Sequence, residues 1–215
     1  MKYKGKFIVL EGIDGCGKGT QAKELAMYLF GIDKKNHILI TREPTNISPY
    51  GRKVRELLRK CRDPKQEAEY FTKLYVKDRW HHIKCAIEPA LRYGSIVVCD
   101  RYKYSTISYQ LAQGIELKKL LDLHKGMIKP DITFIIDVSV DEAIRRIYRT
   151  KNMKDVFEKK DFLELVRNNY LKMKDIFKRE NIVIIDGMQT PQYVFYDIKR
   201  KIDHLLTVHS HERFV

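Results

Sequence analysis

A glycine-rich turn between a short apolar run and an amphipathic segment constrains this chain more than any other feature. Residues 7–10 are apolar and long enough for a buried parallel strand, and apolar residues recur at helical spacing after Lys18. The intervening Gly-Ile-Asp-Gly-Cys-Gly-Lys (12–18) fits a phosphate-binding loop, whose glycines let backbone N–H groups converge on phosphate oxygens. Lys18 is expected between the β- and γ-phosphates of a nucleotide. The predicted ATP-contacting residues of the loop are Gly12, Ile13, Asp14, Gly15, Cys16, Gly17, Lys18, Gly19 and Thr20.

The residue after the lysine departs from the usual pattern. That position is ordinarily a serine or threonine whose hydroxyl binds Mg²⁺, but here it is Gly19, and Thr20 follows one place later. The resulting Gly-Lys-Gly-Thr resembles the loop of adenylate-kinase-type nucleotide kinases. Because Mg²⁺ sheds its water reluctantly, we expect phosphate oxygens, water and a carboxylate elsewhere in the chain to hold it.

Length and composition are those of one globular domain spanning 1–215. The chain has 215 residues, of which 44% are apolar and 33% charged. It contains no apolar run of about 18 residues, the length that a membrane-spanning helix needs. The first predicted strand follows the N-terminus so closely that we expect no signal peptide. The four cysteines lack the spacing of a zinc site or a disulfide framework, which favours a cytoplasmic protein.

The net charge of +14 supports several interpretations. A basic surface attracts polyanions such as nucleic acid, and an enzyme that handles nucleotide phosphates also needs local positive charge. A charge-rich surface is equally typical of a thermophilic protein. Because lysines and arginines are spread over the whole length, composition alone leaves these alternatives open.

Five apolar runs alternate with helical segments. The runs are β-branched or apolar throughout, as expected of strands buried on both faces: Phe7–Leu10, Ile38–Thr41, Ile96–Cys99, Thr133–Asp137 and Ile182–Ile185. Helical periodicity predicts helices near 18–30, 50–61, 65–92, 104–124, 140–149, 159–179 and 191–207. This alternation predicts a three-layer α/β fold with a five-stranded parallel sheet flanked by helices, and ligands at the carboxyl ends of the strands. The polar stretch 149–155 suits a mobile flap.

Polar residues follow the strands at those ends. The first run leads into the loop that contains Asp14, the second into Thr41-Arg42-Glu43-Pro44, and the third into Asp100-Arg101-Tyr102. Any one of these charges is typical of a solvated loop. Together, on the edge that carries the phosphate-binding loop, they favour an active site.

These motifs resemble the thymidylate kinase family over nearly the whole chain and in order. The resemblance implies a P-loop NTPase fold with a LID flap at about 146–158, transfer of a phosphoryl group from ATP to dTMP with Mg²⁺, and a homodimer. The matching residues are 11–18, Thr-Arg-Glu-Pro (41–44), Gly51, Arg55-Glu56-Leu57-Leu58, Asp78-Arg79, Asp100-Arg101-Tyr102, Ser105-Thr106, Tyr109-Gln110, Pro130-Asp131, Phe157-Glu158 and Ile185-Asp186-Gly187.

The resemblance also implies a dTMP site. Arg42 and Arg101 are expected to hold the phosphate, and Asp14 to contact the 3′-hydroxyl. Tyr75 stands where the family usually has a phenylalanine stacked on thymine, and Tyr109 is expected under the sugar, where it disfavours a 2′-hydroxyl. The predicted dTMP-binding residues, with Arg79 and Gln110 at the thymine edge, are Asp14, Arg42, Tyr75, Arg79, Arg101, Tyr109 and Gln110.

The resemblance also indicates which side chains supply positive charge for catalysis. Some family members carry an arginine in the phosphate-binding loop directly after the aspartate, where this chain has Gly15. The others supply basic residues from the flap. In this chain Arg149 is our first choice for the γ-phosphate, and Arg146 is expected against adenine. Further basic residues of the flap are Arg145, Lys151 and Lys154. Asp100 is expected to orient Mg²⁺ through water. The predicted catalytic residues are Lys18, Asp100, Arg101 and Arg149, with no protein general base, because the acceptor is already a phosphate oxygen.

Two competing functions follow from the same features. The Gly-Lys-Gly-Thr loop also suits a kinase for another nucleoside monophosphate, although Asp-Arg-Tyr at 100–102 and Arg79 favour dTMP. The charge of +14 also suits a P-loop ATPase stimulated by nucleic acid. We expect neither a nucleic acid nor a membrane as a partner.

Overall fold

The computed structural model describes residues 3–60, 67–150 and 160–210. Their strands form one sheet in the order β2-β3-β1-β4-β5, and every neighbouring pair is parallel. The strands are β1 (Lys6–Glu11), β2 (Ile38–Arg42), β3 (Ile96–Asp100), β4 (Ile132–Asp137) and β5 (Ile182–Asp186). The predicted five-stranded parallel α/β sheet is therefore confirmed.

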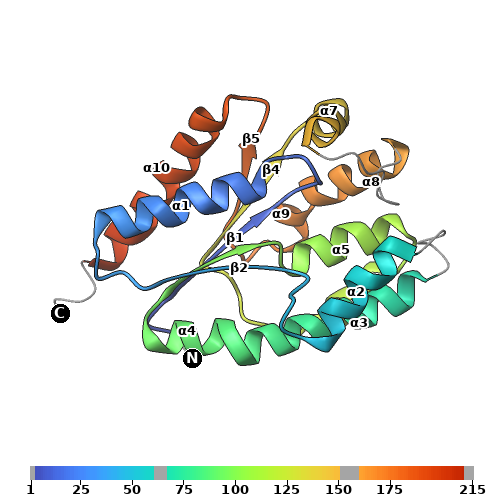
Figure 1. Ribbon diagram of the computed structural model, residues 1–215, viewed down its shortest axis with the longest axis horizontal. Coiled ribbons are helices and arrows are strands. Elements are labelled where there is room, and N and C mark those ends of the chain that lie inside the picture. Colours follow the sequence, from blue (N-terminus) through green and yellow to red (C-terminus); the bar gives the residue numbers. More distant parts are fainter. Residues whose placement is uncertain (1–2, 61–66, 151–159, 211–215) are drawn as a thin grey trace.

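Helices cover both faces of this sheet. Helices α1 (Lys18–Ile32) and α10 (Pro191–Ser210) lie side by side on one face, and α4 (Glu88–Tyr93) and α8 (Lys160–Leu171) pack against the other (Figure 1). A further group of helices packs together, with α2 on α3 and α3 on α5. The remaining elements are α2 (Pro49–Lys60), α3 (Ala68–His82), a π-helical turn (Ile83–Ile87), α5 (Lys103–Ala112), α6 (Leu117–Leu123), α7 (Val140–Thr150) and α9 (Met173–Ile176).

The expectation that every strand is buried on both faces is right for the inner strands and wrong for the two outer ones. β1, β3 and β4 are almost completely buried. In β2 and β5, by contrast, Ile40 is 51% exposed and Ile184 is 42% exposed. The helices that pack on the sheet leave part of its outer strands uncovered, so these edge strands keep apolar side chains at the surface.

Three long predicted helices are interrupted. The segment predicted at 104–124 divides into α5 and α6, because Gly114 adopts φ +93 and ends the first helix. The segment predicted at 65–92 contains α3, a π-helical turn and α4, and 159–179 divides into α8 and α9. Nothing in the sequence around Lys172 marks that last break.

The predicted flap falls largely outside the described residues. Residues 146–150 belong to α7, and α8 begins at Lys160. Residues 151–158, which include Lys151, Lys154 and Phe157-Glu158, are not among those described. Within the described ranges, no helix combines the length and apolar character needed to cross a lipid bilayer.

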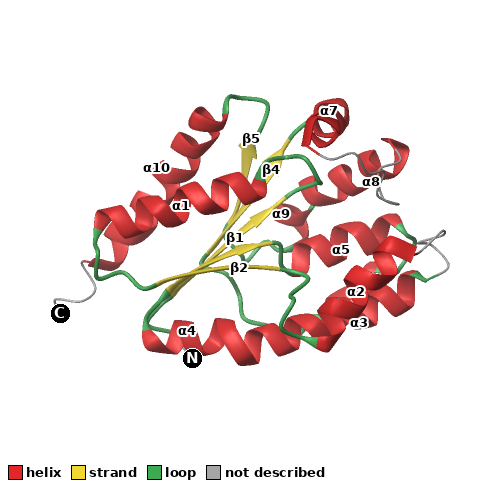
Figure 2. Cartoon of the chain, viewed as in Figure 1, coloured by secondary structure: helices red, strands yellow, loops and turns green. Residues whose placement is uncertain are grey.

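The parallel arrangement brings the loops that follow β1, β2 and β3 to one edge of the sheet (Figure 2). Arg42 at the end of β2 is in register with Asp100 at the end of β3, and Leu10 of β1 is in register with the same Asp100. The predicted convergence of polar residues at the carboxyl ends of the strands is confirmed, and it positions the site described next.

Candidate active site

The phosphate-binding loop joins β1 to α1, which begins at Lys18 as the sequence predicts. Gly15 adopts φ +82, and a Cβ there would lie 2.3 Å from the carbonyl oxygen of Ala143 in α7, so a side chain cannot be accommodated. Ile13 and Cys16 are each only 2% exposed because their side chains pack into the core. These two residues can therefore meet a phosphate only through their backbone N–H groups.

Lys18 lies inside the loop rather than on the surface. Its side chain is buried, and its Nζ donates hydrogen bonds to the carbonyl oxygens of Gly12 at 3.0 Å and Ile13 at 2.8 Å. Both acceptors belong to the loop that would surround the nucleotide phosphates. The ammonium group is thus held next to the predicted phosphate position.

One cavity adjoins this loop, and every residue of the predicted dTMP site lines it. Tyr75 forms part of its wall and is half-buried, with its ring 6.3 Å from that of Phe71 in a stacked arrangement. Burial raises the pKa of Tyr75 to about 12, so its hydroxyl stays protonated at neutral pH. The lining residues are Asp14, Arg42, Glu43, Pro44, Arg55, Leu58, Tyr75, Arg79, Arg101, Ser105, Thr106, Tyr109, Gln110 and Leu163.

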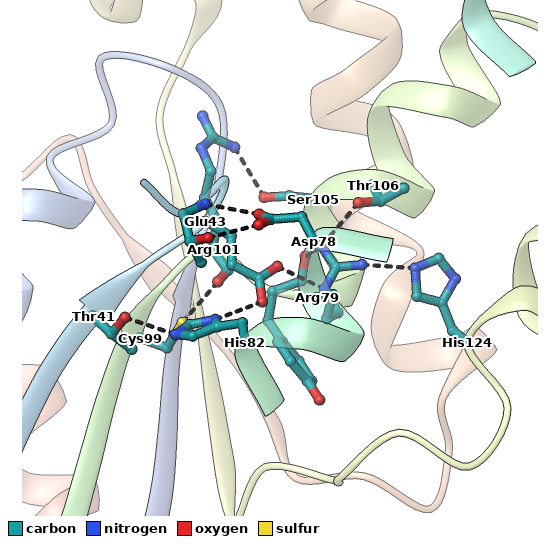
Figure 3. Close-up of polar contacts among 12 residues, drawn as sticks. Thr41, Glu43, Asp78, Arg79, His82, Cys99, Arg101, Ser105, Thr106 and His124 are labelled. Carbon is teal, nitrogen blue, oxygen red and sulfur yellow. Dashed lines mark hydrogen bonds and ion pairs between the residues drawn. The ribbon is translucent and has the colours of Figure 1, made fainter. Parts of the chain in front are cut away.

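Arg101 links the cavity to the phosphate-binding loop. Its guanidinium donates to Asp14 Oδ1 at 2.6 Å. It also donates to Ser105 Oγ at 2.9 Å (Figure 3). The hydroxyl of Tyr109 donates to the other oxygen of Asp14 at 3.2 Å. Desolvation alone would raise the pKa of Asp14, but the charges of Arg101 and Lys18 outweigh it and lower that pKa. Asp14 is therefore an ionised counter-charge at the junction of the loop and the cavity.

Glu11 is linked to Arg101 through Ser105, whose hydroxyl contacts both side chains. Sequence reasoning did not identify Glu11 as a site residue. The fully buried carboxylate accepts from the backbone N–H groups of Tyr102 at 2.7 Å and Ser105 at 3.2 Å, and from Ser105 Oγ at 2.5 Å. It thereby accepts from the N–H group of Tyr102, the residue that precedes α5, and from one N–H group in the first turn of that helix. Burial raises the pKa of Glu11. A glutamate that ends an otherwise apolar strand is the sequence feature that could have identified it.

Arg55 is a second residue that sequence reasoning left without a role. It lines the cavity beside Arg42, and its guanidinium donates to the carbonyl oxygen of Pro44. Burial and the nearby charge of Arg42 lower the pKa of Arg55. Gly51, Arg55 and Leu58 share one face of α2, and this spacing could have indicated a face turned toward the cavity.

Arg79 is 1% exposed, yet it forms part of the cavity wall. Its Nε donates to Glu43 Oε2 at 2.6 Å, and its Nη2 donates to the carbonyl oxygen of Tyr102 and to Thr106 Oγ1, each at 2.9 Å (Figure 3). Its Nη1 lies 2.7 Å from His124 Nε2. The side chain predicted to meet the thymine edge is thus held by partners on several elements.

Asp100 lies beside the unusual glycine of the loop. A Cβ at Gly19 would be 3.5 Å from Asp100 Oδ2. The other oxygen, Oδ1, is buried and accepts no hydrogen bond from the residues that the structure describes. A carboxylate with a buried unpartnered oxygen suits a hydrated cation, so the residues present fit Mg²⁺. Thr20 is exposed on the first turn of α1.

The two flap arginines lie apart from the cavity. Arg146 pairs with Glu142 at 2.6 Å and donates to the carbonyl oxygen of Gly187 at 3.0 Å, at the turn between β5 and α10. Arg149 is exposed in the last turn of α7. Neither is among the described residues that line the cavity. Helix α7 nevertheless adjoins the phosphate-binding loop, because Ala143 packs against Gly15.

Comparison with known proteins agrees with this site. The family model described as "Thymidylate kinase" matches residues 10–198. A "Probable thymidylate kinase" of Pyrococcus abyssi is 38% identical over 206 residues, which cover 94% of this chain and 98% of the relative. A "Thymidylate kinase" of Brachyspira hyodysenteriae is 42% identical over 165 residues, which cover 76% of this chain and 78% of the relative. With a parallel sheet, a phosphate-binding loop and an adjoining arginine-lined cavity in place, the chain belongs to the thymidylate kinase family.

Proposed function

We propose that this kinase phosphorylates dTMP to dTDP with ATP as the phosphoryl donor. The observation that carries the proposal is a cavity beside the phosphate-binding loop, which is lined by every residue of the predicted dTMP site. Arg101 and Asp14 join that cavity to the loop, so donor and acceptor phosphates would meet at their ion pair. Family membership and the names of the relatives support the same substrate.

On the acceptor side, arginines gather around the place for the monophosphate. Arg42, Arg55 and Arg101 all line the cavity. Three positive charges would hold a phosphate and neutralise its repulsion of the incoming phosphoryl group. Tyr75 would stack on the base, Tyr109 would lie under the sugar, and Arg79 and Gln110 would meet the base edge. Gln110 Oε1 is buried and has no hydrogen-bond partner in the described residues, which suits a group that pairs with a ligand.

On the donor side, the backbone N–H groups of the loop and Lys18 would hold the ATP phosphates. Asp100, beside Gly19, would hold Mg²⁺ through water, and the bound ion would supply charge neutralisation on the phosphate oxygens. Arg149 would add a cation from the end of α7, and Arg146 would lie against adenine. No side chain need remove a proton, because the acceptor is already an ionised phosphate oxygen. The homodimer and the cytoplasmic location stay predictions.

The test is an ADP-release assay with dTMP, dUMP, UMP, CMP and AMP as acceptors. We expect dTMP to give the highest kcat/KM, and Lys18→Ala to lower the rate by on the order of 10²–10³, the scale for one preorganised charged donor. A higher kcat/KM with another monophosphate would show a different substrate. ATP hydrolysis stimulated by DNA or RNA, without transfer to dTMP, would show a nucleic-acid-dependent ATPase instead.

A further inference from the structure

A buried histidine outside the cavity contacts the arginine that forms part of its wall. His124 follows α6 and is 5% exposed. Its Nδ1 lies 2.6 Å from the carbonyl oxygen of Leu120, and its Nε2 lies 2.7 Å from Arg79 Nη1. A carbonyl oxygen only accepts hydrogen bonds and a guanidinium only donates them. The ring must therefore carry its proton on Nδ1 and accept at Nε2.

This neutral form is also the one that the surroundings favour. Burial, followed by the positive charge of Arg79, lowers the pKa of His124 to about 3. The ring consequently keeps its accepting nitrogen at any pH at which the enzyme would work. A protonated ring would bring two positive charges into contact in a buried site.

The remaining contacts of Arg79 leave little freedom for its guanidinium. Glu43 accepts from Nε, while the carbonyl oxygen of Tyr102 and Thr106 Oγ1 accept from Nη2. A guanidinium has five N–H donors. With His124 taking one hydrogen of Nη1, the second hydrogen of Nη1 is the one donor for which the described residues provide no acceptor.

Glu43, which accepts a hydrogen bond from Nε of Arg79, is itself held by a second histidine. Glu43 Oε1 lies 3.0 Å from His82 Nδ1, and His82 Nε2 lies 2.7 Å from Thr41 Oγ1 (Figure 3). Thr41 lies near the end of β2 and Glu43 directly follows that strand, whereas His124 follows α6. Figure 3 shows the Arg79 side chain between these two supports, with His124 on the side away from Glu43.

We propose that His124 is a positioning residue for base selection: it fixes Arg79 Nη1 so that its remaining N–H meets a carbonyl oxygen on the base of the bound monophosphate. The inference rests on the proposed function. A fixed N–H donor pairs with the 4-oxo group of thymine and opposes the 4-amino group of cytosine. His124 therefore contributes to the preference for dTMP over dCMP without touching either substrate.

Two substitutions at position 124 separate this role from simple packing. His124→Phe keeps a ring but removes the acceptor, and His124→Gln keeps an acceptor for Arg79. For His124→Phe we expect KM for dTMP to rise about tenfold, kcat and KM for ATP to stay within about twofold, and the dTMP-to-dCMP ratio of kcat/KM to fall about tenfold. His124→Gln should restore most of that ratio.

Met127→Ala is the matched control, because Met127 is buried in the same segment and makes no polar contact with Arg79. We expect it to lower the melting temperature while leaving the dTMP-to-dCMP ratio unchanged. A ratio unchanged in His124→Phe, or lowered equally in Met127→Ala, would overturn the proposal. Wild-type enzyme inactive on dTMP would instead overturn the proposed function.

Nitrogen NMR of the wild-type protein tests the geometry independently of the kinetics, with His124→Gln used only to assign the signal. In ¹⁵N-histidine-labelled protein, the signal lost in His124→Gln should report a protonated Nδ1 and an unprotonated Nε2 between pH 6 and pH 8. A proton on Nε2 would contradict acceptance from Arg79 and would overturn the proposal whatever the kinetics show.

Discussion

Arg101 Nη2 lies 2.6 Å from Asp14 Oδ1, so an ion pair joins the end of β3 to the phosphate-binding loop. The same guanidinium reaches Ser105 Oγ and the hydroxyl of Tyr170, and its backbone adopts φ +72, which side-chain-bearing residues rarely do. Several elements therefore fix the position and plane of this one cation. Such fixed placement is what phosphoryl transfer requires of a charge that must meet the migrating group.

Arg101→Lys tests whether that fixed geometry matters. A lysine keeps the charge but presents a single ammonium group, which cannot reach Asp14, Ser105 and Tyr170 together. We expect kcat/KM for dTMP to fall by on the order of 10²-fold. Arg92→Lys, in an exposed pair with Glu88, is the matched control and should leave the kinetics unchanged. Wild-type kcat/KM in Arg101→Lys would show that charge alone suffices at this position.

Tyr109 is predicted to select the deoxyribose, since its ring lines the cavity and its hydroxyl bonds Asp14. Tyr109→Ala should narrow the preference for dTMP over its ribonucleotide counterpart, because removing the ring relieves a penalty on the 2′-hydroxyl. Tyr109→Phe keeps the ring and should keep the preference. The measurement is kcat/KM for both substrates, and an unchanged ratio in Tyr109→Ala would place sugar selection elsewhere.

The contacts around Gly19 predict that Mg²⁺ binding depends more on Asp100 than on the hydroxyl of Thr20. Asp100 has a buried oxygen without a partner in the described residues, while Thr20 is exposed. Asp100→Asn should therefore raise the Mg²⁺ concentration needed for half-maximal rate or lower kcat, and Thr20→Val should have a smaller effect. Titration of Mg²⁺ at saturating ATP and dTMP measures both. Equal losses in the two variants would contradict this division.

Arg149 is predicted to act on the transferring phosphate. Arg149→Ala should lower kcat by about tenfold or more and leave KM for dTMP nearly unchanged, the pattern of an interaction made mainly in the transition state. Arg145→Ala is the matched control on the same helix, because Arg145 already pairs with Glu142 at 2.6 Å. If KM for dTMP rose while kcat stayed constant, Arg149 would belong to acceptor binding instead.

The fold was predictable because its determinants are local. Apolar runs and helical spacing located every strand to within one residue at either end, since buried parallel strands need continuous apolar sequence. The exposure of Ile40 and Ile184 was not predictable in this way, because strand order across the sheet depends on pairing between distant segments. The break at Gly114 depends on one backbone conformation within an otherwise helical pattern.

The candidate site was also predictable only in part. The dTMP-site residues could be predicted because recognisable motifs carry them at the strand ends. Glu11 and Arg55 carry only weak signals, a polar end to an apolar strand and a helical spacing, and His124 carries none, because each acts through tertiary contacts with other segments of the chain. His124 in particular stands in no motif, and its partner Arg79 lies 45 positions earlier in the chain.

The low pKa of His124 predicts how stability depends on pH. In the unfolded chain a histidine binds a proton below about pH 6.5, whereas in the folded protein His124 stays neutral down to about pH 3. Between those values the unfolded state binds more protons, so the free energy of unfolding falls as pH falls, by up to about 1.4 kcal/mol per pH unit from this group. The contribution of this group to the free energy of unfolding is complete above about pH 6.5 and is lost progressively toward pH 3.

Urea unfolding at pH 7.5 and pH 5 measures this effect. The free energy of unfolding should fall between these two pH values by about 1–2 kcal/mol more for the wild type than for His124→Gln. Equal losses in the two proteins would mean that His124 titrates alike in the folded and unfolded states. That result would contradict a neutral His124 in buried contact with Arg79.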